Sequence, residues 1–180
     1  MIKKVAVIGP ESTGKSTLCE QLASHYRTAW LPEYAREYLG QHGSQYTYND
    51  LLGIAKEQVA SEERLIHSVE ANKTTSLLFI DTNLHVMKVW CEYVFNRCHP
   101  WILEMIAERQ YDLYLLCDTD LPWVQDELRE YPDLERRREL YHIYKDMMEN
   151  QPATWVNISG DYEQRLQKAV KAVDELLVRH

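Results

Sequence analysis

Residues 5–16 read Val-Ala-Val-Ile-Gly-Pro-Glu-Ser-Thr-Gly-Lys-Ser, an apolar run followed by the pattern G-x-x-x-x-G-K-S/T. The apolar run predicts a buried strand, and the residues after it predict a helix from about residue 14 to about residue 26. Between such a strand and helix, successive backbone N–H groups form a concave site for anions. The stretch therefore predicts an α/β fold with a loop that binds the phosphates of ATP or GTP.

The fixed positions of this loop have separate physical tasks. Gly9 and Gly14 allow backbone angles and a close approach that a side chain would prevent. Lys15 can reach the β- and γ-phosphate oxygens, and the Ser16 hydroxyl is a ligand for Mg²⁺. We expect the loop to hold the nucleotide through these residues: Gly9, Glu11, Ser12, Thr13, Gly14, Lys15, Ser16 and Thr17.

Length and composition limit the remaining function classes. The 180 residues predict a single domain, residues 1–180, and the formal charge of −8 argues against a nucleic-acid partner. No apolar run approaches the roughly 20 residues that span a bilayer, so we expect no membrane partner. The first strand begins at residue 2, which leaves no room for a signal peptide, and the four cysteines form no C-x-x-C pair. These features predict a cytoplasmic protein, and they indicate no oligomeric state.

Apolar runs alternate with helical periodicity along the chain, which predicts a mostly parallel sheet. We expect strands at residues 2–8, 28–32, 76–81, 113–117 and 154–159. Between the strands we expect helices at residues 34–39, about 50–71, 84–95, 100–109 and 162–177. Asn49 or Asp50 is the expected cap of the long helix, and two helices separated near Pro132 are expected within residues 119–150.

Two further acids follow buried strands, at the edge of the sheet where such folds bind ligands. Asp81 ends the run Leu-Leu-Phe-Ile-Asp, the form of a Walker B segment, and would orient Mg²⁺ together with Ser16. The alternative for Asp81 is a helix cap. Glu33 follows the second strand, where it could accept the proton of a hydroxyl group or bind a ribose diol. Arg36, one turn later, could clamp a substrate or form an internal salt bridge with Glu33.

Residues 119–138 form a charged stretch that we predict to be a lid. Small kinases of this fold close arginines over the transferred phosphoryl group, and Trp123 is suited to stack on a flat ring. The candidate arginines are Arg129, Arg136, Arg137 and Arg138. The alternative is a solvated helix with charge pairs three and four residues apart.

Among nucleotide-binding classes, a regulatory GTPase should carry D-x-x-G and N-K-x-D motifs. The chain instead has Asp81-Thr82-Asn83-Leu84 and Asn72-Lys73-Thr74-Thr75, so this class is disfavoured. The short chain and the arginine-rich stretch before the last strand favour a small-molecule kinase. A kinase for another nucleoside or small alcohol remains an alternative, as does an ATPase that acts as a nucleotide-dependent switch with a protein partner.

Several longer segments resemble one family. They are GPESTGKST (9–17), PEYAREY (32–38), FIDT (79–82), YDLYLL (111–116), PWVQDELR (122–129) and GDYEQR (160–165). In order and over nearly the whole chain, they resemble the ribosylnicotinamide kinase domain of NadR-type NAD-salvage proteins. The resemblance implies a three-layer P-loop kinase sandwich of five strands with a helical lid, standing alone without the adenylyltransferase domain that family members often carry.

The resemblance also implies a reaction: ATP would phosphorylate the 5′-hydroxyl of nicotinamide riboside to give nicotinamide mononucleotide. ATP and Mg²⁺ would be the cofactors, and Ser16 and Asp81 would hold the metal. We assign catalytic roles to Lys15, Glu33, Asp81 and Arg129, with Glu33 as the base and Asp81 as its rival. Arg138 joins the ATP-binding residues. The nucleoside would be bound by Glu33, Tyr34, Arg36, Asp81 and Trp123.

Overall fold

The strands are short apolar runs because a parallel strand inside a sheet is covered on both faces. The computed structural model describes residues 2–73, 75–125 and 130–178, which form one five-stranded sheet and seven helices. The strands are β1 (Lys3–Ile8), β2 (Ala29–Leu31), β3 (Leu77–Asp81), β4 (Leu113–Cys117) and β5 (Trp155–Ile158). Each lies within one residue of its predicted bounds, so the α/β fold class is confirmed.

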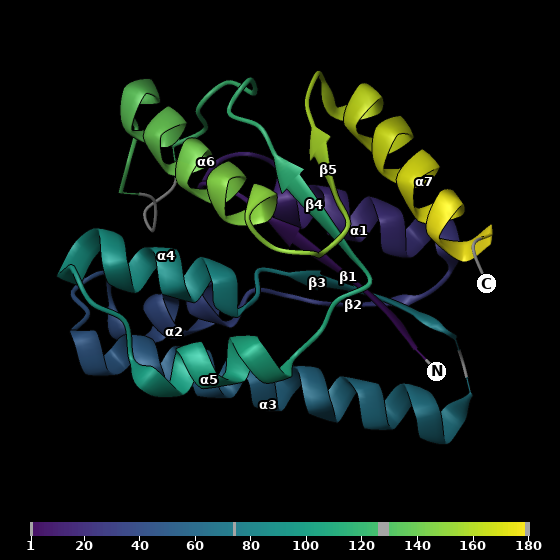
Figure 1. Cartoon of the computed structure of the whole chain (residues 1–180), viewed down its shortest axis with the longest axis horizontal. Coiled ribbons are helices and arrows are strands. Elements are labelled where there is room, and N and C mark those ends of the chain that lie inside the picture. Colours follow the sequence, from purple (N-terminus) through teal and green to yellow (C-terminus); the bar gives the residue numbers. More distant parts are fainter. Residues whose placement is uncertain (1, 74, 126–129, 179–180) are drawn as a thin grey trace.

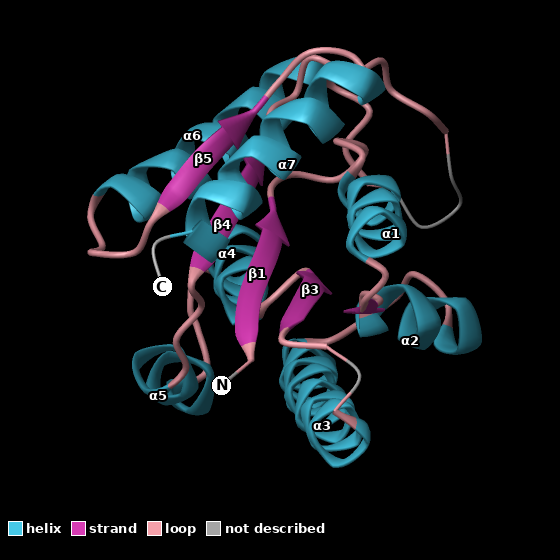
Figure 2. Cartoon of the chain, turned by 90° about the vertical axis from the view of Figure 1, so that its right-hand side faces the viewer, coloured by secondary structure: helices cyan, strands magenta, loops and turns pink. Residues whose placement is uncertain are grey.

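The strand order is β2-β3-β1-β4-β5, and all neighbouring strands are parallel. The labelled arrows of β1, β3, β4 and β5 point the same way in Figure 2. Because β1 lies between β3 and β4, the loop that follows it is next to the ends of both. The end of β2 lies beside that of β3, so the three strand ends singled out in the sequence are neighbours.

Alternate residues of β1 face two different helical layers. Val5 and Val7 pack against α1 (Lys15–Tyr26) and α7 (Tyr162–Val178). Ala6 and Ile8 pack on the opposite face, against α4 (Leu84–Phe95) and α6 (Leu134–Glu149). Figure 1 shows β4 and β5 between α6 and α7. The sheet is therefore the middle of three layers, as predicted.

The remaining helices widen the layer that contains α4. The long helix α3 (Tyr48–Asn72) contacts β2, and it packs with α2 (Tyr34–His42), α4 and α5 (Pro100–Glu108). The predicted cap of α3 was wrong. Thr47 is the cap: its hydroxyl accepts the Asp50 N–H, while the Asp50 carboxylate accepts the Thr47 N–H, which together form a capping box.

The predicted helix ahead of Pro132 is absent from residues 119–125 and 130–133, the parts of that stretch that the structure describes. The N–H groups of Val124, Glu130 and Tyr131 instead donate to side chains of the phosphate loop. Backbone donors bound in this way are not available for helical bonds. Only the second helix of this region, α6, forms as expected, and it begins after Asp133, whose carboxylate accepts the Glu135 N–H.

Candidate active site

The loop between β1 and α1 has the shape that its sequence predicts. Gly9 has a φ of 136°, and a Cβ atom there would lie 2.7 Å from the Cys117 carbonyl oxygen of the neighbouring strand. Gly14 precedes α1 with a φ of 78°, a left-handed conformation that favours glycine. Within the described residues no side chain caps α1, so its first N–H groups face the loop without side-chain partners. A helix start of this kind is an anion site.

Lys15 and Thr13 both bond to one carbonyl group of the loop. The Lys15 ammonium lies 2.9 Å from the Pro10 carbonyl oxygen, and the Thr13 hydroxyl donates to the same oxygen over 2.7 Å. Burial raises the pKa values of Glu33 and Asp81, and the Lys15 charge opposes that rise at both acids. The lysine therefore lies where it can reach a phosphate group bound by the loop.

Ser16 and Asp81 meet where β1 and β3 pair. The register places Asp81 opposite Val7, and the Ser16 hydroxyl donates to a carboxylate oxygen of Asp81 over 2.5 Å. Asp81 is buried, which raises its pKa, while Lys15 and the Ser16 hydrogen bond act in the opposite direction. A hydroxyl and a carboxylate oxygen in contact are the hard ligands that Mg²⁺ prefers, with phosphate oxygens and water completing its shell.

Glu33 lies at the end of β2, one strand further along the sheet. It precedes α2, and its side chain does not cap that helix. Burial raises the pKa of Glu33 to about 7, with the Asp81 charge adding to the rise and Lys15 and Arg36 opposing it. A carboxyl group with a pKa near neutrality is suited to accept a proton. Glu33 and Arg36 both line the cavity beside the phosphate loop.

Gln58 of α3 connects the two acidic strand ends, and the sequence analysis missed it. Its side-chain oxygen accepts the Tyr34 N–H over 2.8 Å, and its amide donates to the carbonyl groups of Thr82 over 3.0 Å and Asp81 over 3.4 Å. Gln58 is only 4% exposed. A polar residue among apolar neighbours on the buried face of α3 was the signal that could have revealed it.

A cavity of about 190 Å³ extends from the phosphate loop between α2, α4 and α6. Its far wall is apolar and aromatic, with a carboxylate at its edge. That wall is lined by Leu39, Val86, Val89, Trp90, Tyr93, Glu130, Tyr131, Leu140 and Tyr144. Apolar walls beside a few convergent polar groups are typical of small-molecule sites. The phosphate-loop residues 9–17 form the opposite end, and Asp81 contacts Ser16 just beyond it.

Besides Asp81, the predicted residues Tyr34, Trp123 and Arg138 also lie outside the described lining of this cavity. Tyr34 packs in the apolar cluster between α2, α3 and α4. The Trp123 ring centre is 5.3 Å from the Arg137 guanidinium, and Arg138 is exposed. Arg137, by contrast, is 3% exposed, on the face of α6 that carries Leu140 and Tyr144. Arg129 lies outside the described residues.

Glu11 and Ser12, which line the cavity, also bond through their side chains to the segment that precedes α6. The Glu11 carboxylate accepts the N–H of Glu130 over 3.1 Å and also that of Tyr131. The Ser12 hydroxyl oxygen accepts the Val124 N–H over 3.1 Å. Their backbone groups therefore remain for the nucleotide, while their side chains hold both described ends of the segment that precedes α6.

The described residues contain neither a membrane-spanning helix nor a cluster of metal-ligating side chains. None of their helices is long and apolar enough to cross a membrane. Within the same residues, no group of three or more histidine, cysteine or acidic side chains is arranged around a common metal position. The Ser16–Asp81 pair is thus the arrangement to consider for a cation, and it supplies two protein ligands.

Comparison with known proteins identifies the family. A family model described as AAA domain matches residues 4–165, most of the chain. The chain belongs to this AAA domain family. This AAA domain is also similar to two curated proteins described as trifunctional NAD biosynthesis/regulator protein NadR. It is 31% identical to that of Escherichia coli (strain K12) and 29% identical to that of Salmonella typhimurium. Both alignments span 98% of this chain and 43% of the relative, so the chain spans less than half the length of these proteins.

Two solved structures share the fold of the AAA domain. One, described as NadR protein in complex with NR, aligns with a TM-score of 0.79 and 23% identity over 97% of this chain and 51% of that chain. The other, described as NadR protein in complex with NAD and AMP-PNP, has a TM-score of 0.75 and 24% identity over 97% and 49%. At this level of identity the likeness establishes the three-layer fold of the domain.

Proposed function

We propose that this chain is an ATP-dependent kinase that phosphorylates the 5′-hydroxyl of nicotinamide riboside. The observation that carries the proposal is the juxtaposition of Glu33 with Lys15 and the Ser16–Asp81 pair, at the end of an aromatic cavity. The resemblance to NadR proteins, one of them solved in complex with NR, supports this choice of acceptor. A nucleotide-bound NadR structure supports the choice of donor.

The phosphate loop binds the donor. Backbone N–H groups of residues 12–17 surround the phosphates, and Lys15 leaves the Pro10 carbonyl to contact the β- and γ-phosphate oxygens. Ser16 and Asp81 would hold Mg²⁺, which when bound neutralises phosphate charge. In this proposal the γ-phosphorus lies at the phosphate-loop end of the cavity, and the acceptor oxygen attacks it in line with the leaving oxygen.

Glu33 receives the proton of the acceptor. As the 5′-oxygen forms its bond to the γ-phosphorus and the bond to the leaving ADP oxygen breaks, the hydroxyl proton passes to the Glu33 carboxylate. Glu33 is preferred to Asp81 because Asp81 is already bonded to Ser16, whereas Glu33 faces the cavity. Arg36 lines the cavity and is our candidate cation for the transferred phosphoryl group, while Arg137 is buried on the face of α6 that carries Leu140 and Tyr144. The roles of Arg129, Arg138, Tyr34 and Trp123 remain predictions.

The first experiment measures ADP release with Mg·ATP and nicotinamide riboside, in parallel with adenosine, cytidine, uridine and thymidine, with mass detection of the product. We expect nicotinamide mononucleotide, formed in equal amount to ADP and absent with Lys15→Ala. If only a different nucleoside were phosphorylated, that nucleoside would replace nicotinamide riboside as the proposed acceptor. ATP turnover that no nucleoside accelerates would contradict the kinase proposal and favour an ATPase with a protein partner.

A second experiment identifies the base. Glu33→Gln should lower kcat by about 100-fold or more, while the dissociation constant of ATP stays within about twofold of the native value. Glu37→Gln is the matched control, because Glu37 lies one turn further along α2, is exposed and bonds only to Gln41 among the contacts described. An unchanged kcat in Glu33→Gln would transfer the role of base to Asp81.

A further inference from the structure

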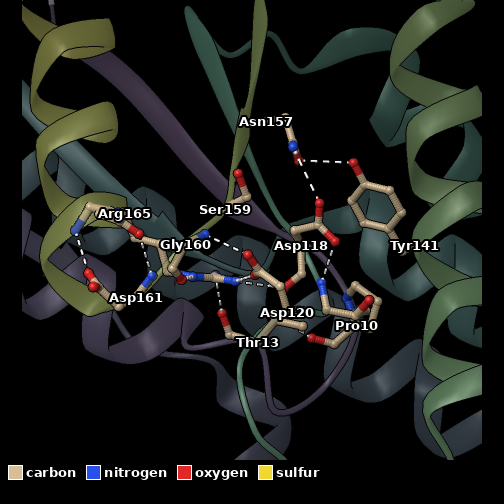
Figure 3. Close-up of polar contacts among 12 residues, drawn as sticks. Pro10, Thr13, Asp118, Asp120, Tyr141, Asn157, Ser159, Gly160, Asp161 and Arg165 are labelled. Carbon is tan, nitrogen blue, oxygen red and sulfur yellow. Dashed lines mark hydrogen bonds and ion pairs between the residues drawn. The ribbon is translucent and has the colours of Figure 1, made fainter.

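Arg165 is a buried arginine outside the cavity that contacts the phosphate loop. It lies in the first turns of α7 and is 3% exposed. Its guanidinium donates to the carbonyl groups of Thr13 over 2.8 Å, Asp118 over 2.9 Å and Gly160 over 2.7 Å. It also forms an ion pair with the carboxylate of Asp120. Figure 3 shows the guanidinium among these four partners.

The partners belong to three separate segments at the carboxyl edge of the sheet. Thr13 is in the phosphate loop, Asp118 and Asp120 follow β4, and Gly160 follows β5. The Asp120 carboxylate also accepts the Gly160 N–H over 2.5 Å, so the ion pair and the loop after β5 are held together. One planar side chain thus connects the loops that follow β1, β4 and β5, three neighbouring strands of the sheet.

The chemistry of this position suits arginine and not lysine. Arginine presents several N–H donors in one fixed plane, whereas the lysine ammonium is a point charge on a flexible stem. A buried guanidinium is tolerated when it is paired and hydrogen-bonded, and Asp120 supplies the opposite charge. Reciprocal hydrogen bonds between Asp161 and Gln164 fix the start of α7, and with it the direction from which Arg165 reaches Thr13.

The contact with the Thr13 carbonyl group also fixes the direction of the Gly14 N–H group. A trans peptide unit is planar, and its C=O and N–H bonds point in opposite directions. When Arg165 holds the Thr13 oxygen, the N–H of Gly14 in the same peptide unit must point away from the guanidinium. Thr13 and Gly14 line the cavity, whereas Arg165 is absent from its described lining. The arginine therefore acts from behind the loop.

We propose that Arg165 is a positioning residue for phosphate binding, which sets the direction of the Gly14 N–H through the Thr13 carbonyl. The inference rests on the proposed binding of nucleotide by this loop. The inference is tested by measuring nucleotide binding rather than turnover, so it does not depend on the identity of the acceptor. If the proposed acceptor were wrong, the native chain would form no nicotinamide mononucleotide.

The test compares Arg165→Gln with the native chain. Titration with ADP, and competition of pyrophosphate against a fluorescent ADP analogue, give dissociation constants with and without the adenosine part. We expect both constants to rise by about tenfold, the effect of losing one charge-assisted hydrogen bond. The KM for nicotinamide riboside should stay within about twofold. Lys168→Met is the control, because Lys168 also bonds to the loop after β5, at Ser159, but has no described contact with the phosphate loop.

Asp120→Asn provides a second variant that retains the arginine but removes its counter-charge, and it should raise both constants by about threefold. If Arg165→Gln does not fold, Asp120→Asn tests the proposal in its place. A fall in melting temperature with both constants unchanged would overturn the proposal, since Arg165 would then only anchor α7. Weaker ADP binding with unchanged pyrophosphate binding would also overturn it, because the effect would come from the loops beside the adenosine.

Discussion

Buried or half-buried carboxylates lie at both ends of the parallel sheet, in different surroundings. At the carboxyl end, Glu33 and Asp81 share one nearby lysine and have raised pKa values. At the amino end, Glu62 of α3 is 2% exposed and has three partners. They are the Lys4 ammonium at 3.2 Å, the Arg109 guanidinium at 3.1 Å and the Tyr111 hydroxyl at 2.7 Å.

The difference in bonding partners distinguishes acids that can take part in a reaction from acids that stabilise the fold. A buried acid whose oxygens are all bonded to its own protein is available for nothing else, and removing it leaves buried charges unpaired. A half-buried acid such as Glu33, which faces a cavity and holds its proton to about pH 7, can exchange that proton with a bound molecule. We therefore expect substitutions of Lys15 and Glu33 at the carboxyl end to change activity more than stability, and substitution of Glu62 at the amino end to do the reverse.

The largest effect is expected for Lys15→Ala at the carboxyl end. Loss of the cation that contacts the β- and γ-phosphates should lower kcat/KM by about 1000-fold. The melting temperature should change little, because in this structure the ammonium bonds only to the Pro10 carbonyl among the described contacts. Steady-state kinetics and thermal unfolding of the same preparation test this. A large fall in melting temperature would show that the lysine supports the loop itself.

Glu62→Gln tests the other end of the sheet. Two half-buried cations, Lys4 and Arg109, would lose their shared buried counter-charge, so the free energy of unfolding should fall by about 3 kcal/mol. The kcat/KM of the folded enzyme should stay within about twofold. Urea unfolding measures the first quantity. Glu57→Gln in the same helix is the control: its ion pair with Arg64 is exposed, so its loss should cost at most about 0.5 kcal/mol.

The pH dependence of the native chain gives a third test. The folded protein holds the Glu33 proton to about pH 7, whereas the unfolded chain releases it near the ordinary value of 4.5. The protonated form therefore contributes stability below about pH 4.5, and this contribution is lost as the pH rises to about 7. Native stability should fall relative to Glu33→Gln over this range. Conversely, kcat/KM should fall tenfold for each pH unit below 7, because the base must be ionised. A flat profile of kcat/KM would exclude Glu33 as the base.

Gln58→Leu should give the smallest effect of the four. The variant leaves the Tyr34 N–H and the Thr82 carbonyl without their partner, which should cost about 2 kcal/mol of stability. Because Gln58 sets the spacing between the ends of β2 and β3, kcat should also fall by about fivefold, with ATP affinity unchanged. Equal losses of kcat and ATP affinity would place the effect in the phosphate loop instead.

The sequence predicted the strands well for a physical reason. Each strand contains a short apolar run, and β3 and β4 are buried along their whole length. The neighbouring positions of Glu33 and Asp81 followed only from the strand order, which the sequence pattern alone does not determine. The cap of α3 was within reach, because Thr47 and Asp50 have the spacing of a capping box.

The lid was predicted least well because its residues respond to partners far away in the chain. The bonds from Glu11 and Ser12 to the lid backbone join residues more than a hundred positions apart. The choice between Arg137 and Arg138 depends on which face of α6 turns inward. Arg137 is buried on the same face as Leu140 and Tyr144, whereas Arg138 is exposed, and this packing has no local signal. The role of either arginine stays a prediction.

Helix α4 contributes both to the wall of the cavity and to the interior of the protein. Val86, Val89, Trp90 and Tyr93 line the cavity, while Leu84, Met87 and Cys91 on the opposite face pack among α2, α3 and α5. The helix cannot move outward without opening a void in that packing. An engineer who wants a bulkier acceptor should therefore shorten a side chain on the cavity face, starting with Tyr93, and leave the position of the helix unchanged.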